Sequence, residues 1–259
     1  MPMIDADGCP IHVAIDGRES GPTVVLSNSL GTTINMWEPQ LAALADHFRV
    51  VRYDRRGHGK SGTTGPYSFE RFGRDVIAIL DALNIRTAHW CGLSMGGMVG
   101  QWLGANAADR FDRLVLANTT SHIADPSRFA DRIKQVTANG MASIADAVIA
   151  TWLTEDFRER EPLVAQEIKR MFSATPVAGY VGCCEALSRL DQRELLGKVT
   201  RPVLIVAGRY DMSTTVEQAE YMRKHIPKAD MTLLDAAHLS NVEQSYAFND
   251  ALIGFLTQR

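Results

Sequence analysis

The sequence is poor in cysteine, with four such residues among 259, two of them adjacent. No pair has the C-x-x-C spacing of redox or zinc sites, and four cysteines are too few for a disulfide-built scaffold in a chain of this length. We therefore expect reduced thiols, as in a cytoplasmic protein. The four residues are Cys9, Cys91, Cys183 and Cys184.

Long hydrophobic runs are also missing. No apolar stretch approaches the ~18 residues that span a bilayer, and the first residues lack the basic-then-apolar pattern of a secretory signal. Neither charge dominates, because 27 Lys and Arg stand against 30 Asp and Glu, for a net charge of -3. Nucleic-acid binders normally show a basic excess. We expect a cytoplasmic protein that binds neither a membrane nor nucleic acid.

Hydrophobic side chains are plentiful, at 46% of the chain, which is enough for a large core without disulfide or metal support. In the first half, short β-branched runs alternate with helical patterns. This alternation predicts a parallel sheet covered by helices on both faces. The first run is expected to form an antiparallel edge strand. The predicted strands are residues 11–15, 23–26, 49–53, 89–91, 114–117, 203–207 and 231–234.

The alternation stops in the middle of the chain, where residues 118–201 contain no convincing strand. An unstructured loop of about 80 residues is implausible in a compact domain. We therefore expect a helical cap, residues 121–198, inserted into a core made of residues 1–120 and 199–259. The helical patterns inside this segment are residues 129–136, 141–153, 163–172 and 177–190.

The strongest motif is G-L-S-M-G-G at residues 92–97, which has the pattern G-x-S-x-G. It follows a predicted strand and opens a stretch with helical periodicity, which is the context that this motif requires. Glycines beside the serine avoid collisions with neighbouring backbone on so tight a turn. The turn sets the Ser94 hydroxyl at a helix N-terminus, which favours developing negative charge. Ser94 is the candidate nucleophile, against the alternative of an incidental serine in a glycine-rich turn.

A serine hydroxyl needs a base at neutral pH, and His238 is the leading candidate among the seven histidines. It lies just after the last predicted strand, at the edge where parallel sheets place their sites. His58, at the end of another predicted strand, is its serious rival. The other five histidines lie in predicted strands, at helix ends or in the cap.

A third residue, an acid, must hold the imidazole in one tautomer. Asp211 directly follows the predicted strand 203–207, and its place between nucleophile and base matches the chain order Ser…Asp…His of α/β hydrolases. Asp235 lies only three residues before His238, and Asp54 precedes the nucleophile. We expect both of these carboxylates to be structural, with Asp54 bracing the turn that follows it.

An acyl-transfer site also needs N–H donors for the oxyanion. One is the backbone N–H of Met95, the residue after the nucleophile. The second is assigned to the backbone N–H of Leu30, in the loop after the strand 23–26. A His-Gly pair is common in that loop, whereas this chain has Asn28 and Ser29. Because the donor is a main-chain group, the side chains around it can vary.

Residues 57–62 match two nucleotide-binding patterns, and we interpret both matches as turns. They have the spacing G-x-G-x-x-G after a strand, but no helix opens at the glycines. The triplet G-K-S at residues 59–61 resembles the end of a phosphate loop, yet Asp54 stands where that motif needs a glycine. No histidine has a metal-ligand spacing with a suitable partner. We expect neither a cofactor nor a metal.

Three segments together resemble the 3-oxoadipate enol-lactonases, which are α/β-hydrolase-fold enzymes of aromatic catabolism. They are residues 26–32 (L-S-N-S-L-G-T), 52–61 (R-Y-D-R-R-G-H-G-K-S) and 91–97 (C-G-L-S-M-G-G). Much of the superfamily shares elements of the last two, whereas the first is similar to the enol-lactonase branch. Residues 152–154 and 237–241 are also similar, so the likeness covers nearly the whole chain.

The resemblance implies an α/β-hydrolase fold: an eight-stranded, mostly parallel sheet flanked by helices, with the helical cap inserted after the sixth strand. It also implies that 3-oxoadipate enol-lactone is opened to 3-oxoadipate, in the catabolism of protocatechuate and catechol. His238 would deprotonate Ser94, the backbone N–H groups of Leu30 and Met95 would hold the oxyanion, and water would hydrolyse the acyl-enzyme. The implied partner is the small lactone, and no cofactor is needed.

The carboxylate of such a substrate needs a partner in the cap. Trp152 is expected to wall the pocket or to donate its indole N–H, against the alternative of a tryptophan that only packs in the core. Arg128, Arg132 and Lys134 are cations of the cap, and we expect each to be solvated, against the alternative that it faces the pocket.

Two other functions stay open at this point. One is a different serine hydrolase on the same core, acting on an ester, another lactone or the C–C bond of a ring-cleavage product. The other is a binding protein without catalysis, which should have lost a member of the triad. All three triad candidates are present here, which weakens that alternative.

Overall fold

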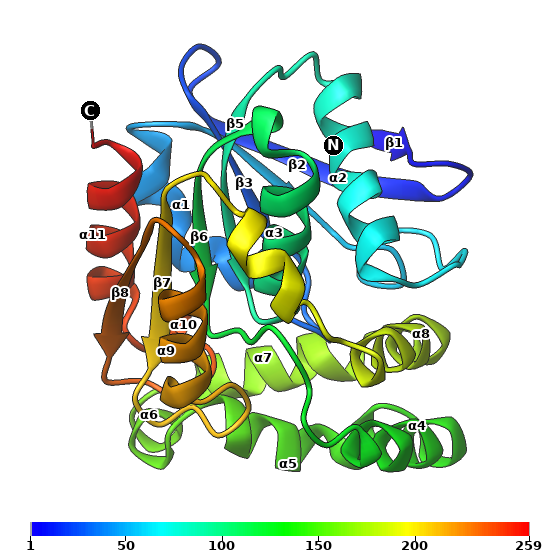
Figure 1. Cartoon of the computed structure of the whole chain (residues 1–259). Helices are drawn as coiled ribbons and strands as arrows, with labels where there is room; N and C mark the ends of the chain where they lie inside the picture. Colours follow the sequence, from blue (N-terminus) through cyan, green and yellow to red (C-terminus); the bar gives the residue numbers. More distant parts are fainter. Residues whose placement is uncertain (1, 259) are drawn as a thin grey trace.

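The computed structural model describes residues 2–258 and places eight strands in one sheet, in the order β1-β2-β4-β3-β5-β6-β7-β8 (Figure 1). β2 pairs antiparallel with β1 and β4, and the remaining neighbours are parallel. The predicted fold class is confirmed. The strands are β1 Met3–Asp5, β2 Pro10–Gly17, β3 Thr23–Ser27, β4 Arg49–Tyr53, β5 Ala88–Leu93, β6 Phe111–Ala117, β7 Val203–Gly208 and β8 Ala229–Leu234.

The prediction of an antiparallel edge strand at residues 11–15 was half right. The segment lies in β2 and is antiparallel to its neighbours, but β1 pairs with its outer side, so β1 is the edge strand. β1 has three residues, of which one, Ile4, is buried. A single buried side chain gives no periodicity in a sequence, which explains why β1 escaped prediction.

Helices cover both faces of the sheet. α1 and α11 pack together on one face, while α2 and α3 pack together on the other, where α9 lies against β7 and β8. Ser68 caps α2 as its position suggested, because its hydroxyl accepts the N–H of Arg71 at 3.1 Å. The helices and 3-10 turns of this part are η1 Ile34–Trp37, α1 Glu38–Ala45, α2 Phe69–Ala82, α3 Met95–Asn106, η2 Ala108–Arg110, η3 Arg193–Lys198, α9 Val216–His225, α10 Ser240–Glu243 and α11 Ser245–Leu256.

Five further helices separate β6 from β7 along the chain, and Figure 1 shows them gathered beyond the end of the sheet at which the arrow of β8 ends. The sequence indicated four of them and missed α6, which is one of the shortest and buries a single side chain, Phe157. Their existence after β6 agrees with the prediction. The division of the chain into core and cap domains stays a prediction. The five are α4 Ser127–Asn139, α5 Ala142–Trp152, α6 Glu155–Arg160, α7 Pro162–Ser173 and α8 Val177–Ser188.

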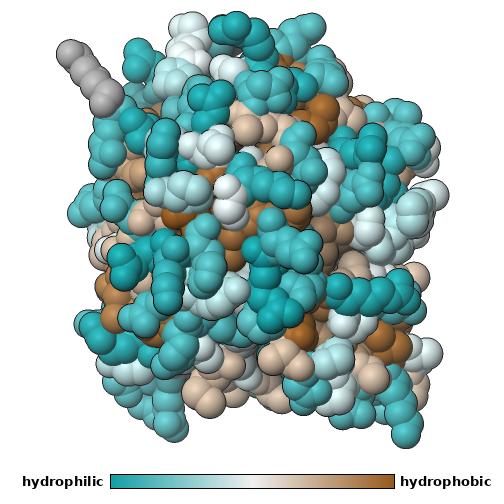
Figure 2. Space-filling view, in the orientation of Figure 1, coloured by the Kyte–Doolittle hydropathy of each residue, from teal (hydrophilic) through white to brown (hydrophobic). Residues whose placement is uncertain are grey.

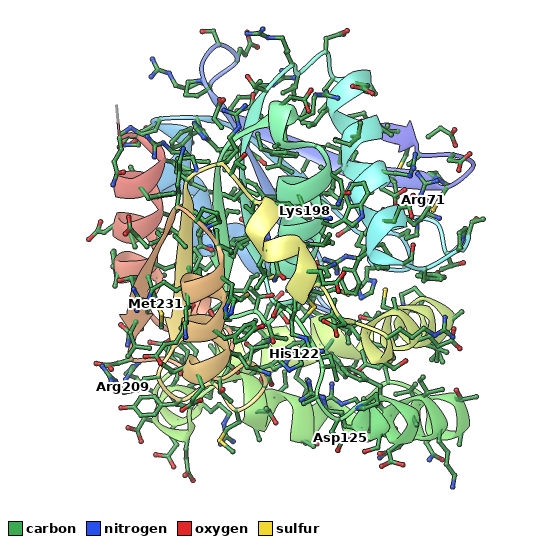
Figure 3. The ribbon with its side chains drawn as sticks, in the orientation of Figure 1. Arg71, His122, Asp125, Lys198, Arg209 and Met231 are labelled. Carbon is green, nitrogen blue, oxygen red and sulfur yellow. The ribbon has the colours of Figure 1, made fainter. Side chains whose placement is uncertain are left out.

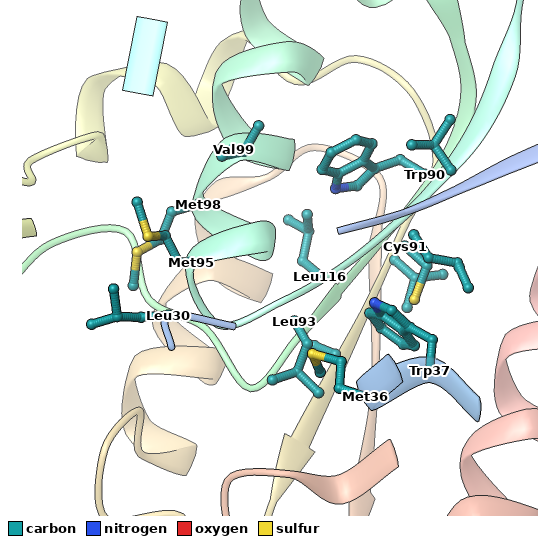
Figure 4. Packing of buried hydrophobic residues seen from close by; sticks show 14 of the residues in the cluster. Leu30, Met36, Trp37, Trp90, Cys91, Leu93, Met95, Met98, Val99 and Leu116 are labelled. Carbon is teal, nitrogen blue, oxygen red and sulfur yellow. The ribbon is translucent and has the colours of Figure 1, made fainter. Parts of the chain in front are cut away.

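The hydrophobic core lies between the sheet and its helices. β3, β5 and β7 are buried along their whole length, as strands covered on both faces must be. Figure 4 shows part of this core, where Trp90 and Leu116 lie beside α3. The face of the molecule shown in Figure 2 is mostly hydrophilic, with apolar side chains scattered over it. Among residues 2–258, no helix has the length and apolar character needed to cross a membrane.

Candidate active site

Ser94 occupies the turn between β5 and α3 with φ 58° and ψ -115°, a backbone conformation that only a constrained turn maintains in a serine. Its N–H donates to the carbonyl of Ala117 at 2.8 Å, which ties the turn to β6. A Cβ on Gly92 would collide with the carbonyl of Gly96, and one on Gly96 would collide with the carbonyl of Ser27. The G-x-S-x-G spacing is therefore a steric requirement of this turn.

Asp211 and His238 are in direct contact, as the sequence predicted. His238 Nδ1 lies 2.8 Å from Asp211 Oδ2, and both side chains are buried. The second carboxylate oxygen accepts the backbone N–H groups of Ser213 at 2.8 Å and Thr214 at 3.0 Å. Burial acts to raise the pKa of Asp211, but the charge of His238 and the hydrogen bonds from His238 and Thr214 outweigh it, so the pKa is lowered. Asp211 stays ionised and holds the imidazole.

Asn118 joins the acid to the loop of the base, and sequence reasoning missed it. Its Nδ2 donates to Asp211 Oδ2 and to the carbonyl of Ala237, at 3.1 Å each, and its Oδ1 accepts the Ser240 hydroxyl at 2.5 Å. Asn118 follows β6 directly with φ 43°. The available signal was its position at the end of a central strand, beside the ends of β5 and β7.

The two alternative acids lie elsewhere. Asp235 directly follows β8, is exposed and pairs at 2.6 Å with Nε of Arg209, the residue after β7 that is labelled in Figure 3. Asp54 is buried and accepts the N–H groups of Ile34 at 2.9 Å and Lys60 at 3.0 Å. Neither contacts His238 within the described residues, which agrees with the structural role expected for both.

His58, the rival base, is fully buried and does not line the cavity at Ser94. Its Nε2 accepts the N–H of Gly31 at 2.8 Å. Burial, and then the charge of Arg55, lower the pKa of His58 to about 3. A neutral imidazole with its Nε2 occupied by a backbone donor is a structural acceptor, and here it supports the loop of the predicted oxyanion donor.

The backbone N–H groups of Leu30 and Met95 are available to a ligand, since neither has a hydrogen-bond partner within residues 2–258. The loop of Leu30 is anchored on both sides. On one side Asn28 accepts from Arg55 Nη2 at 2.7 Å and from Trp37 Nε1 at 2.9 Å, and on the other Gly31 binds His58. Figure 4 shows Leu30 near Met95 at the start of α3.

A small cavity is lined by Leu30, Ser94 and His238, with about 50 Å³ open to the centres of water molecules. Among the described residues, no hydrogen bond involves the Ser94 hydroxyl, so Ser94 and His238 line the same cavity without a hydrogen bond between them. Such contacts often tighten only when substrate binds. The cavity is lined by Ser29, Leu30, Ser94, Met98, Ile123, Arg128, Phe129, Arg132, Trp152, Leu187, Ser213, Thr214 and His238.

The cap residues divide differently from the expectation. Trp152 lines the cavity, buried between Phe172 at a ring-centroid distance of 5.5 Å and His238 at 6.3 Å. Arg128 and Arg132 also line it, although the first keeps an exposed side and the second is half-buried. These two arginines thus face the cavity, which was the less favoured of the two alternatives, although Arg128 is also exposed to solvent. Lys134 is exposed and does not line the cavity, as expected.

Comparison with known proteins places this site in a family. A family model described as the alpha/beta hydrolase fold matches residues 22–245. The chain is 41% identical to 3-oxoadipate enol-lactonase 1 of Acinetobacter baylyi over 254 residues, which cover 98% of this chain and 96% of that protein. The chain belongs to the enol-lactonase family of α/β hydrolases. It is therefore a hydrolase.

Solved structures agree with this membership in the enol-lactonase family. The crystal structure of the enol-lactonase from Burkholderia xenovorans LB400 superposes with a TM-score of 0.97 at 42% identity, covering 99% of this chain and 100% of the other. A thermophilic esterase from Thermogutta terrifontis, solved with malate bound, gives a TM-score of 0.90 at 26% identity, covering 98% and 96% of the two chains.

The remaining motif matches carry no site in this enol-lactonase-family chain. Residues 57–62 form a closed turn in which Gly57 N–H donates to the carbonyl of Gly62 at 2.7 Å, and no helix follows. All four cysteines are free and buried. Among residues 2–258, no group of three or more His, Cys, Asp or Glu side chains is arranged to hold a metal ion.

Proposed function

We propose that this hydrolase opens 3-oxoadipate enol-lactone to 3-oxoadipate, with Ser94 as nucleophile, His238 as base and Asp211 as the acid that orients it. The observation that carries the proposal is one cavity that joins the Ser94 elbow, the buried His238–Asp211 pair and two arginines. The enol-lactonase relatives, at about 40% identity over nearly the full chain, support the same reaction.

The first half-reaction forms an acyl-enzyme. His238 takes the proton of the Ser94 hydroxyl, and the serine oxygen attacks the lactone carbonyl. The carbonyl oxygen becomes an oxyanion that the backbone N–H groups of Leu30 and Met95 bind. Asp211 remains ionised and stabilises the imidazolium that forms.

The tetrahedral intermediate then collapses and the ring C–O bond breaks, which completes the acyl-enzyme. The enol oxygen, which stays in the same acyl group, takes the proton from His238, and the enol tautomerises to the ketone. The second half-reaction returns the enzyme to its starting state. A water molecule, deprotonated by His238, then attacks the acyl-enzyme and releases a second carboxylate together with Ser94. These steps need no cofactor.

The arginines indicate an anionic substrate. Arg128 and Arg132 are four residues apart on α4, so the two like charges lie on one helix face. No ion pair within 4.0 Å includes either of them in the part of the chain that the structure describes. Burial and the charge of Arg132 lower the pKa of Arg128, which an anion in the cavity would reverse. The acetate arm of the enol-lactone supplies such an anion.

We assign recognition of this arm to the predicted cap, residues 121–198, with Trp152 as an apolar wall beside the reacting carbonyl. Malate, bound by the Thermogutta esterase of the same fold, is also a carboxylate. A guanidinium binds a carboxylate through two parallel hydrogen bonds, so two arginines above one serine favour a charged lactone over a neutral ester.

A substrate panel tests the proposal. It contains the enol-lactone, the methyl ester of its acetate arm, an aryl acetate and a dienone-type ring-cleavage product that tests C–C hydrolysis. We expect the highest kcat/KM on the charged enol-lactone. A higher kcat/KM on the aryl acetate would make the protein an esterase, and a higher kcat/KM on the ring-cleavage product would make it a C–C hydrolase.

A further inference from the structure

Glu243 is a buried acid outside the proposed triad that accepts three short hydrogen bonds. It ends α10, and 8% of it is exposed. Its Oε1 accepts the backbone N–H of Thr154 at 3.0 Å and the Thr154 hydroxyl at 2.5 Å. Its Oε2 accepts the backbone N–H of Ala237 at 2.5 Å. One carboxylate thus binds two segments that are more than 80 residues apart in sequence.

Both bound segments carry a wall of the cavity. Ala237 directly precedes His238, and Thr154 lies two residues after Trp152, where α5 gives way to α6. A backbone hydrogen bond from Leu239 N–H to the carbonyl of Trp152, at 3.0 Å, joins the same two segments a second time. The imidazole and the indole lie with ring centroids 6.3 Å apart and an angle of 30° between their planes.

The chemistry of these bonds requires a carboxylate. All three partners donate, and only an acceptor with two oxygens satisfies two N–H groups and a hydroxyl together. The Thr154 oxygen is itself occupied by the N–H of Phe157 at 3.3 Å, so its hydrogen is directed to Glu243. An amide would turn an NH₂ group toward one of the donors and leave it unpaired, which costs more than the loss of a bond in water.

We propose that Glu243 is a positioning residue that fixes the main chain in front of His238 and the wall at Trp152 as one unit. The inference rests on the proposed function of His238. Asp211 holds the imidazole at its Nδ1, whereas Glu243 holds the backbone that carries it, so the two carboxylates restrict different motions. Loss of Glu243 leaves the His238–Asp211 pair intact and lets it shift relative to Ser94.

The test compares Glu243→Gln with Glu155→Gln. Glu155 is an exposed acid of α6 in the same surface region, so its variant controls for the loss of one negative charge. We measure kcat and KM on an aryl acetate, and we count competent sites with a fluorophosphonate that reacts with Ser94. Per titrated site, we expect kcat to fall about 10- to 100-fold in Glu243→Gln and to stay unchanged in Glu155→Gln, as one charge-assisted hydrogen bond predicts.

A second variant keeps the proposal testable if Glu243→Gln does not fold. Thr154→Val removes only the hydroxyl donor and should lower kcat about 2- to 5-fold. Because both changes break the same link, the double variant should be no slower than Glu243→Gln alone. A merely structural Glu243 would reduce the number of titrated sites and leave the kcat of each site unchanged, and that result, or additive losses, would overturn the proposal.

The same assay separates this proposal from the proposed function. Ser94→Ala serves as the reference, because the aryl acetate reaction requires the serine whatever Glu243 does. An aryl acetate activity in Ser94→Ala close to that of wild type would refute the serine mechanism. A normal kcat in Glu243→Gln beside an inactive Ser94→Ala would refute only the positioning role.

Discussion

The floor of the cavity and the helix above it are built differently. The floor, which we define as Ser94, Asp211 and His238, is buried, and Asn118 links Asp211 to the loop of His238 through hydrogen bonds. The helix above it, α4, buries only Phe129 and Val136 and offers its arginines to the cavity without ion-pair partners. The carboxylate and imidazole of the floor are paired with each other, whereas the arginines of α4 have no ion-pair partner among the described residues.

The two regions differ in how much a substitution in each should cost in stability. Buried polar groups must be paired, because an unpaired one costs about 1–3 kcal/mol, so the floor tolerates few changes in side chain or geometry. An exposed arginine loses little when its anion is absent, because water solvates it. We therefore expect substitutions in the floor to affect turnover of every substrate, and substitutions in α4 to affect substrate preference with little cost in stability.

The largest effect is expected at the nucleophile. Ser94→Ala removes one hydroxyl from a turn that is held by backbone contacts, so the fold should persist. Turnover should fall by about 10⁶-fold on both the charged lactone and the neutral ester, as loss of a serine nucleophile does elsewhere. Steady-state kinetics measures the loss of turnover, and circular dichroism checks that the variant is folded. Substantial turnover by the folded variant would rule out the covalent route.

The acid of the floor ranks second. Asp211→Asn removes the charge that stabilises the imidazolium and allows the wrong tautomer, so kcat should fall about 10⁴-fold on both substrates. Asp235→Asn is the control, because Asp235 is an exposed partner of Arg209, and its variant should stay within about 3-fold of wild type. The opposite ranking of the two variants would assign the acid to Asp235.

The arginines of α4 should show selectivity rather than a general loss. The double variant Arg128→Gln/Arg132→Gln lacks both guanidinium groups, so its kcat/KM for the charged lactone should be about 10- to 100-fold lower. The neutral ester should change by less than about 3-fold, because the floor is untouched. Lys134→Gln, on the same helix but away from the cavity, is the matched control. Equal losses on the two substrates would remove α4 from substrate recognition.

Much of the floor was predictable because its signals are local. The G-x-S-x-G turn demands two small residues, and the ends of parallel strands bring Asp211 and His238 to one edge. Asn118 and Glu243 escaped because their partners come from other strands and helices, and only the sheet order and the docking of α5 bring them together. No short pattern in the sequence carries that information.

The orientation of α4 was out of reach for a related reason. Its amphipathic pattern shows which residues share a face, but not whether the neighbouring face meets a cavity or water. That depends on how α4 packs on α8 and on α5, which is decided between segments rather than within one. The helical pattern of α4 alone therefore did not show that Arg128 and Arg132 face the cavity. The short elements β1 and α6 were missed because each buries a single side chain.

The smallest effect concerns His58, which supports the loop of Leu30 without taking part in the proposed chemistry. Its folded pKa of about 3 lies below the ordinary value of 6.5, because burial and Arg55 disfavour the charged form. Between these two values the unfolded chain binds a proton that the folded chain does not. The contribution of His58 to stability is therefore intact above pH 6.5 and decreases as the pH falls toward 3.

The slope of this loss approaches about 1.4 kcal/mol per pH unit, so about 2 kcal/mol should disappear between pH 6.5 and pH 5. Urea unfolding at a series of pH values measures it. His58→Gln places an amide oxygen where Nε2 accepts the Gly31 N–H, so the oxyanion loop keeps its support while the titrating group is removed. This variant should show a shallower decrease below pH 6.5, whereas His47→Gln, which changes an exposed histidine, should keep the wild-type slope. If the free energy of unfolding of His58→Gln decreased as steeply with falling pH as that of wild type, the acid sensitivity would come from another group. The loop of Leu30 would then not depend on a neutral His58.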